Sequence, residues 1–264
     1  MLVSVITINY NNCRGLHQTI LSVVHQEYQN FEFIVIDGGS TDGSLDVIKD
    51  YSDNIAFWVS EQDRGIYHAM NKGVAQAHGD YCIFMNSGDY LYDNYVLGCV
   101  ANSSAIEDII VGKVSIDESD HLISPPPLNG LTLYHLYSGA IPHQGAFIRT
   151  DLLRKYPYDE NLKIASDWKF FVQTLIIDNC SIRYLDIFVS RYDMNGVSSS
   201  NPELMRKEKD EVLASFFPPR VMADYKQMKL EECLTQTLTS QLKKNYGIDK
   251  LLYNIGRFLL KIWR

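Results

Sequence analysis

The sequence predicts an α/β fold in which a mostly parallel central sheet is flanked by helices and followed by a helical C-terminal extension. Apolar, β-branched segments alternate with segments of helical periodicity over residues 2–89, which is typical of parallel strands joined by crossover helices. Polar residues directly follow four successive strands of this pattern. From residue 202 onward the periodicity is helical only. We therefore predict an α/β domain over residues 1–200 and a helical extension over residues 201–264.

Each element of this pattern has its own signal in the residue order. Apolar runs predict strands at 2–8, 31–36, 55–60 and from 81 onward, with helices at 15–27, 45–51 and 66–77 between them. The next part is less regular, and we predict strands at 109–116, 143–148 and 182–189 and helices at 131–138 and 164–177. A small, polar loop follows at 194–201. Helices are then predicted at 203–216, 220–243 and 248–262.

Composition and charge limit the classes of function. The chain has 264 residues, of which 46% are hydrophobic and 21% charged, so a large core is expected. The formal net charge of −8 argues against non-specific binding of nucleic acid. The five cysteines are scattered and form no C-x-x-C pair, which favours a reducing compartment over a disulfide framework or a zinc site. No signal peptide and no membrane-spanning run of roughly 18 apolar residues is recognisable. We expect a cytoplasmic protein.

The end of the chain reverses this acidic character. Residues 243–264 contain six basic residues and one acidic residue, together with apolar residues at helical spacing and a Trp next to the end. A basic amphipathic helix of this kind predicts contact with the surface of a membrane that contains anionic lipids. The alternatives are packing on its own domain and packing on a second subunit in a homodimer.

The polar strand ends predict a ligand site. The carboxyl ends of parallel strands share one edge of a sheet, so the residues at 9–12, 37–42, 61–64 and 86–89 are expected to lie together. In the last of these groups, Asn86, Ser87 and Asp89 follow a buried strand. A lone carboxylate at such an edge suits a divalent cation that also binds a phosphate, because Mg²⁺ keeps waters and takes substrate oxygens as ligands. The alternative for this segment is an ordinary surface turn.

Five segments, taken together, closely resemble the family 2 inverting glycosyltransferases: VITINYN (5–11), IDGGSTDGS (36–44), DRGIY (63–67), AMNKG (69–73) and NSGD (86–89). The resemblance covers residues 2 to about 200 and is most specific in the first 90. It implies the GT-A fold and the use of nucleotide-sugars in the synthesis of bacterial surface polysaccharides. The helical extension lies outside the shared motifs.

The resemblance also implies roles for individual residues in binding the donor. Thr7 and Asn9 are expected to hold the base and ribose, and Asp37 to accept a hydrogen bond from a uracil ring. Helix capping, the other interpretation of Asp37, fits Asp42 better. Further donor contacts are implied near the base and the diphosphate, where a guanidinium suits phosphate geometry: Asp63, Arg64, Lys72, Asn86 and Ser87.

The metal site departs from the family pattern. Asp89 resembles the metal-binding carboxylate of the D-x-D motif, and Mn²⁺ or Mg²⁺ is the implied cofactor. Many members have Asp-Ser-Asp-Asp where this chain has Asn86-Ser87-Gly88-Asp89, so two carboxylates are absent. This departure leaves Asp89 as the one direct protein ligand that the motif supplies. Either the donor diphosphate completes the coordination, or the metal is held through water.

The residues for chemistry come later in the chain. Asp167 matches the family's general base, which takes the proton of the acceptor hydroxyl while its oxygen attacks C1 from the face opposite the nucleotide. His143 and Gln144 resemble a feature that lines the sugar or acceptor pocket, although a lone His before a strand is more often structural. The loop at 194–201 resembles one that closes over the donor.

These expectations combine into one function and three alternatives. We expect transfer from a nucleotide-sugar, with UDP as the nucleotide, to a glycan or lipid-linked acceptor at the inner face of a bacterial membrane. A dinucleotide-dependent oxidoreductase is disfavoured because no G-x-G-x-x-G follows the first strand. A glycoside hydrolase is disfavoured because carboxylates at separate strand ends do not resemble a facing acid pair. A non-catalytic nucleotide-sugar-binding protein of the same fold stays open.

Overall fold

A computed structural model describes residues 1–116, 122–123, 131–193 and 201–246 of the chain. The loop predicted at 194–201, apart from its last residue, and the helix predicted at 248–262 lie outside the described residues. The chain divides into two compact units, Met1–Val212 and Leu213–Arg264. The boundary falls within the helix α9 (Pro202–Phe216).

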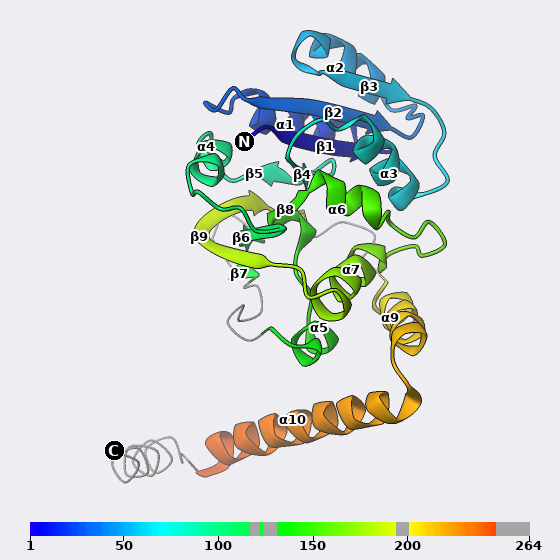
Figure 1. Cartoon of the computed structure of the whole chain (residues 1–264), viewed down its shortest axis with the longest axis vertical. Coiled ribbons are helices and arrows are strands. Elements are labelled where there is room, and N and C mark those ends of the chain that lie inside the picture. Colours follow the sequence, from blue (N-terminus) through cyan, green and yellow to red (C-terminus); the bar gives the residue numbers. More distant parts are fainter. Residues whose placement is uncertain (117–121, 124–130, 194–200, 247–264) are drawn as a thin grey trace. The chain divides into compact units, whose positions relative to one another are not determined.

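The described strands form one sheet in the order β3-β2-β1-β4-β8-β6-β9-β5, with β7 paired to β6 (Figure 1). The first half is parallel, as predicted, and the second half is mixed because β8 runs antiparallel between β4 and β6. The strands have these bounds: β1 Val3–Asn9, β2 Phe31–Asp37, β3 Phe57–Ser60, β4 Tyr81–Phe84, β5 Tyr90–Leu91, β6 Ile109–Ser115, β7 Leu122–Ile123, β8 Ala146–Arg149 and β9 Ile182–Arg191.

Helices cover both faces of the parallel half, which explains why all seven residues of β1 are buried. Val3 and Val5 belong to a core cluster with residues of α1 (Cys13–Val24) and α2 (Ser44–Asp50). On α3 (Ile66–Gln76), the bare backbone of Gly73 lies against Ile6. Successive side chains of a strand point to opposite faces, so α3 packs on the face opposite α1 and α2.

The remaining helices are short until the extension. They have these bounds: α4 Val96–Ala101, α5 Leu133–Ser138, α6 Thr150–Lys155, α7 Ser166–Phe171 and α10 Pro219–Tyr246. Short 3-10 turns occur at Ser52–Asn54 and His143–Gly145, and α7 continues as a π-helical segment at Val172–Ile177. None of the helices in the described part of the chain combines the length and apolarity needed to cross a membrane.

Three of the elements whose bounds differ from the prediction are informative. α1 begins at Cys13, before the apolar pattern starts, because Asn12 caps it and accepts a hydrogen bond from the Gly15 amide at 3.1 Å. The predicted strand at 143–148 opens with a 3-10 turn, closed by a hydrogen bond from the Gly145 amide to the Pro142 carbonyl. The helix predicted from 164 begins at Ser166. The first difference adds Cys13 and Arg14 to a helix, whereas the other two take His143–Gly145 out of a strand and residues 164–165 out of a helix.

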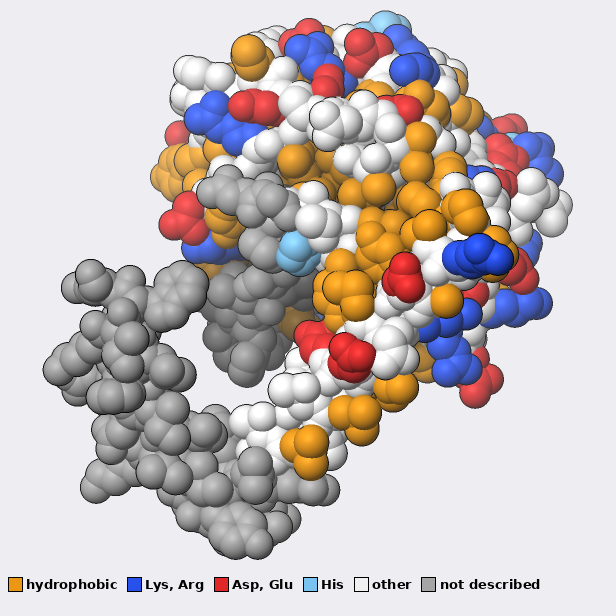
Figure 2. All heavy atoms as spheres, turned by 60° about the horizontal axis from the view of Figure 1, so that its bottom comes forward, with side chains coloured by type: hydrophobic (Ala, Val, Ile, Leu, Met, Phe, Trp, Pro, Cys, Tyr) orange, Lys and Arg blue, Asp and Glu red, His pale blue; other side chains and the backbone are white. Residues whose placement is uncertain are grey.

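The helix α10 carries exposed apolar side chains. Leu230, Leu234 and Leu238 are 54–58% exposed, and they recur every four residues along one stripe of the helix. Figure 2 shows hydrophobic side chains spaced along a helical stretch of the surface. Three such residues in one stripe form an exposed apolar surface on this helix.

Candidate active site

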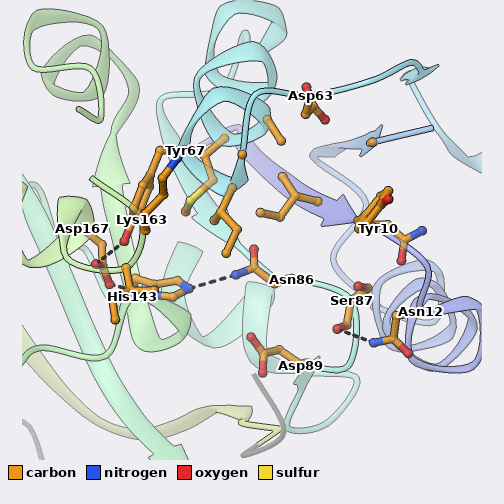
Figure 3. Close-up of a pocket in the computed structure, with 18 of the residues that line it drawn as sticks. Tyr10, Asn12, Asp63, Tyr67, Asn86, Ser87, Asp89, His143, Lys163 and Asp167 are labelled. Atoms are coloured by element: carbon orange, nitrogen blue, oxygen red, sulfur yellow. Dashed lines mark hydrogen bonds and ion pairs between the residues drawn. The ribbon is translucent and has the colours of Figure 1, made fainter. Parts of the chain in front are cut away.

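A cavity of about 940 Å³ lies at the carboxyl ends of the parallel strands. Its walls come from the segments after β1, β2, β3 and β4, joined by residues from 143–144, 163–167 and 192–193 (Figure 3). The structure brings nine of the predicted site residues to these walls: Asn9, Asp63, Arg64, Asn86, Ser87, Asp89, His143, Gln144 and Asp167. Three others, Thr7, Asp37 and Lys72, lie behind the walls and do not line the cavity.

Asp167 lies in the first turn of α7, between two side chains that bind its carboxylate. The Tyr67 hydroxyl donates to Oδ1 at 2.9 Å, and His143 Nδ1 lies 3.1 Å from Oδ2. Burial alone would raise the pKa of Asp167, but the His143 hydrogen bond and charge and the Tyr67 hydroxyl hold this pKa below its ordinary value. Asp167 is therefore an ionised carboxylate at neutral pH, ready to accept a proton.

His143 connects Asp167 to the end of β4. Its Nε2 lies 3.3 Å from the amide nitrogen of Asn86, on the side of the ring away from Asp167 (Figure 3). Burial would lower the pKa of His143, but the hydrogen bond to Asp167 raises this pKa above its ordinary value. The 3-10 turn, rather than a strand, is the element that aims His143 and its neighbour Gln144 at the cavity. The lone His therefore has a specific partner in the site.

Asp37 holds the cavity wall from behind. It is fully buried, and its carboxylate accepts hydrogen bonds from Asn9 Nδ2 at 2.7 Å, from the Ser60 hydroxyl at 2.6 Å and from Ser40. Burial raises the pKa of Asp37, yet these donors lower it overall. The Asn9 amide oxygen, by contrast, is buried at the cavity wall without a hydrogen-bond partner among the described residues. Asn9 therefore offers an acceptor to a ligand.

Asp63, after the third strand, is likewise bound by neighbouring side chains, and within the described ranges it likewise keeps one buried oxygen without a partner. Its Oδ1 binds Lys72 Nζ at 2.8 Å and His68 Nδ1 at 2.9 Å, and its buried Oδ2 has no hydrogen-bond partner in the described part of the chain. Lys72 also binds Glu61, so its ammonium group is engaged in holding Asp63. Arg64 lines the cavity, and its side chain is 71% exposed and ion-paired with Glu160 at 2.5 Å.

Asp89 and Asp193 lie together on the cavity wall, and Asp89 interacts with His143 and Gln144. Asp89 is 4% exposed, and burial raises its pKa to about 6. The Asp193 amide donates to Asp89 Oδ1 at 2.9 Å. The Asp193 carboxylate lies against Gly88, where φ is +108° and a side chain would meet Asp193 Oδ2 at 2.8 Å. A residue with a side chain at position 88 would displace this second carboxylate.

The oxygen atoms at this end fit a hard divalent cation. Two neighbouring carboxylates that open onto a cavity are suitable ligands for Mg²⁺ or Mn²⁺. Among the described residues, no cluster of three His, Cys, Asp or Glu side chains is suited to hold a metal ion. The site therefore fits a cation that takes further oxygens from a bound diphosphate and from water.

Two residues that line the cavity, Tyr67 and Asp193, were not predicted as site residues from the sequence. Tyr67 belongs to a recognised motif, but its hydroxyl reaches Asp167 across 100 positions of sequence. Asp193 follows β9 without any motif of its own, and only its hydrogen bond to Asp89 marks it. A Tyr at the start of a helix and an Asp at the end of a strand are ordinary residues there, so no local signal distinguishes them.

Known proteins resemble the chain in sequence and in fold. The family described as glycosyl transferase family 2 matches residues 4–155. An uncharacterized glycosyltransferase of Mycobacterium tuberculosis is 33% identical over 209 residues, which are 75% of this chain and 77% of that protein. A PGL/p-HBAD biosynthesis glycosyltransferase of Mycobacterium bovis is 28% identical over 206 residues, covering 75% of this chain and 79% of that protein.

Two solved structures support the fold. S. aureus TarS 1-349 in complex with UDP-GlcNAc superposes with a TM-score of 0.67 at 21% identity, over 81% of this chain and 66% of that one. Glucosyl-3-phosphoglycerate synthase of Mycobacterium tuberculosis, in complex with Mn²⁺, UDP and phosphoglyceric acid, has a TM-score of 0.53 at 18% identity, over 80% and 77% of the two chains. The GT-A fold expected from the resemblance is confirmed. With a family match over more than half of its length, this chain belongs to glycosyl transferase family 2.

Proposed function

We propose that this protein transfers a sugar from a nucleotide-diphosphate donor to a hydroxyl group of a glycan or lipid-linked acceptor, with inversion at C1. The observation that carries this proposal is that one cavity is lined both by Asp167, an ionised carboxylate suited to act as a base, and by the neighbouring carboxylates Asp89 and Asp193. Such a cavity has room for a diphosphate at one end and an acceptor hydroxyl at the other.

In this mechanism the chain holds the two reactants on opposite faces of the transferred sugar. Asp167 takes the proton of the acceptor hydroxyl, whose oxygen then forms a bond to C1 as the bond from C1 to the diphosphate oxygen breaks. Tyr67 and His143 keep Asp167 ionised and oriented for this step. No covalent intermediate is needed, because the acceptor attacks directly.

The donor would lie along the strand ends. The unpaired oxygens of Asn9 and Asp63 are the acceptors offered to a nucleobase and ribose, and UDP is our proposed nucleotide because TarS and the synthase were solved with uridine nucleotides. Asp37 binds Asn9 and Lys72 binds Asp63 from behind the wall. A divalent cation held by Asp89 and Asp193 would neutralise the charge of the leaving diphosphate. Arg64 would also help to neutralise this charge, once its ion pair with Glu160 is broken.

The acceptor and location are proposed from the sequence and from one relative. The relative named for PGL/p-HBAD biosynthesis suggests a glycolipid or surface glycan as the acceptor class. The basic residues of 243–264 would hold the protein at the cytoplasmic face of an anionic membrane. A homodimer through the exposed stripe of α10 is the alternative role for the extension.

A thermal-shift screen of nucleotide-sugars, with and without Mn²⁺, tests the donor site. We expect a UDP-sugar with Mn²⁺ to raise the midpoint of unfolding more than either component alone, because a ligand that binds only the folded state stabilises it. Release of UDP should then occur with the wild-type protein and be lost in Asp167→Asn, while the thermal shift of this variant persists. Binding without turnover by the wild type would instead favour a non-catalytic nucleotide-sugar-binding protein.

A further inference from the structure

A buried carboxylate from the extension lies directly behind the wall that carries Asp167. Glu208, on α9, is 5% exposed. It accepts hydrogen bonds from three consecutive backbone amides: Lys163 at 2.7 Å, Ile164 at 3.0 Å and Ala165 at 3.0 Å. Three successive amides that point at one carboxylate define the backbone conformation of this segment closely, because each bond restricts a different peptide plane.

The segment that Glu208 binds, residues 163–165, directly precedes the turn that carries Asp167. Lys163 and Ile164 line the cavity, and α7 begins at Ser166, so Asp167 follows the last bonded amide by two residues. A shift in residues 163–165 would move the start of α7 and with it the Asp167 carboxylate. The distances from Asp167 to Tyr67 and to His143 would change together.

The next residue of α9, Lys209, also contacts the region around Asp167. Lys209 Nζ lies 4.8 Å from the centre of the Trp168 ring and donates to the Gly139 carbonyl at 3.0 Å. Trp168 directly follows Asp167, and its indole nitrogen donates to the Leu136 carbonyl at 2.9 Å. Two neighbouring residues of α9 therefore contact the backbone before Asp167 and the side chain after it.

We infer that Glu208 is a positioning residue for the base: its carboxylate fixes the backbone at 163–165 and so orients Asp167 toward the acceptor hydroxyl. This inference rests on the proposed function, because it assigns Asp167 the role of base. It also makes α9 part of the active site, although the family match ends at residue 155. The competing explanation is that Glu208 stabilises the fold and has no effect on the chemistry.

The variant Glu208→Gln, compared with Glu211→Gln, separates these explanations. Gln keeps the size of Glu208, but its NH₂ group turns one hydrogen bond acceptor into a donor that faces a backbone amide. Glu211 lies on the same helix, is largely exposed and pairs only loosely with Lys207 at 3.8 Å. Both variants lose one negative charge, so the matched control removes any general effect of charge.

We expect Glu208→Gln to lower kcat by about tenfold to a hundredfold, with KM for the donor within about threefold of wild type, because small misplacements of a reacting group have costs of this size. The acid limb of the pH profile should also move to higher pH, as Asp167 moves away from the groups that lower its pKa. The titratable groups that face Asp167 are Tyr67, His143, Tyr158 and Lys209. Glu211→Gln should match wild type in all three measurements.

Hydrogen exchange supplies a readout that needs no turnover. In Glu208→Gln, the amides of residues 163–165 should exchange faster than in wild type, whereas in Glu211→Gln they should not. If Glu208→Gln does not fold, Glu208→Asp, which keeps the charge and shortens the reach, takes its place with the same expectations.

The outcomes distinguish the two proposals. An active wild type, with unchanged kcat and pH profile in Glu208→Gln well below its unfolding temperature, would overturn the positioning role and leave the transferase intact. Unchanged exchange at 163–165 would overturn it as well. A wild-type protein that turns over no nucleotide-sugar would overturn both the proposed function and this inference.

Discussion

Tyr67 and Tyr158 are neighbouring buried tyrosines, with ring centres 5.6 Å apart. The Tyr67 hydroxyl donates to Asp167, whereas the buried Tyr158 hydroxyl has no hydrogen-bond partner in the described part of the chain. At the scale of single residues, this pair isolates the effect of one hydrogen bond on the ionisation of Asp167.

We expect Tyr67→Phe to move the acid limb of the pH profile of kcat/KM to higher pH. The base works as a carboxylate, so activity is present above the pKa of Asp167 and is lost as the pH falls through it. Removing a donor that lowers this pKa raises it, and activity is then lost earlier on acidification. Tyr158→Phe, the matched control, should keep the wild-type profile, and an equal shift in both variants would refute the assignment.

The carboxylate of Asp89 gives a second prediction at this scale. We expect Asp89→Asn to abolish the part of UDP-sugar binding that depends on Mn²⁺, because an amide is a weaker ligand for a hard cation than a carboxylate. Calorimetric titration with and without Mn²⁺ measures this difference. Asp46→Asn, an exposed site on α2, should bind like wild type. Retention of metal-dependent binding by Asp89→Asn would remove Asp89 from the metal site.

At the scale of elements, the contact between α3 and β1 positions the cavity wall that includes Tyr67. Gly73 makes this contact possible, since a Cβ at that position would overlap the Ile6 side chain. On α4, by contrast, a Cβ at Gly98 would lie 3.7 Å from its nearest neighbour, in ordinary contact. Replacing Gly with Ala at both positions therefore separates the cost of overpacking, expected at Gly73, from the gain in helix propensity, expected at Gly98.

We expect Gly73→Ala to lower the free energy of unfolding by about 1–3 kcal/mol, the usual cost of overpacking a core. Gly98→Ala should raise it by up to about 1 kcal/mol, because Ala favours the helix over Gly. Urea unfolding followed by circular dichroism measures both changes. An unfolding free energy at or above that of wild type in Gly73→Ala would show that α3 tolerates a shift away from β1.

At the scale of the whole molecule, the chain carries a net negative charge, whereas its last segment, residues 243–264, is basic. We expect a truncation before Lys243 to release the protein from anionic liposomes, because six basic residues are removed with one acidic residue. Cosedimentation at low and high salt measures this, and neutral liposomes serve as the control. Undiminished binding by the truncated protein would reject the tail as an anchor.

Much of this architecture is readable in local residue order. The strands and helices of residues 2–89 follow from apolar periods, and the polar strand ends indicated one edge of the sheet as the site. The bounds of α1 and α7 were less accurate, because Asn12 caps α1 outside the apolar pattern and the amides before Ser166 bind Glu208 instead of joining a helix. Local periodicity records burial and not such individual hydrogen bonds.

The order of elements over residues 2–89 and the GT-A fold were evident from the residues and their resemblance to a family, and Asp89 and Asp167 were singled out in the same way as candidate site residues. The folded chain alone decided that Asp37 binds Asn9 from behind the wall, that Asp193 binds Asp89, that Tyr67 and His143 bind Asp167, and that Glu208 binds the backbone before it. These partners lie 24 to 104 positions apart in sequence. Hydrogen bonds over such separations depend on how strands and helices pack, which no local pattern of residues records.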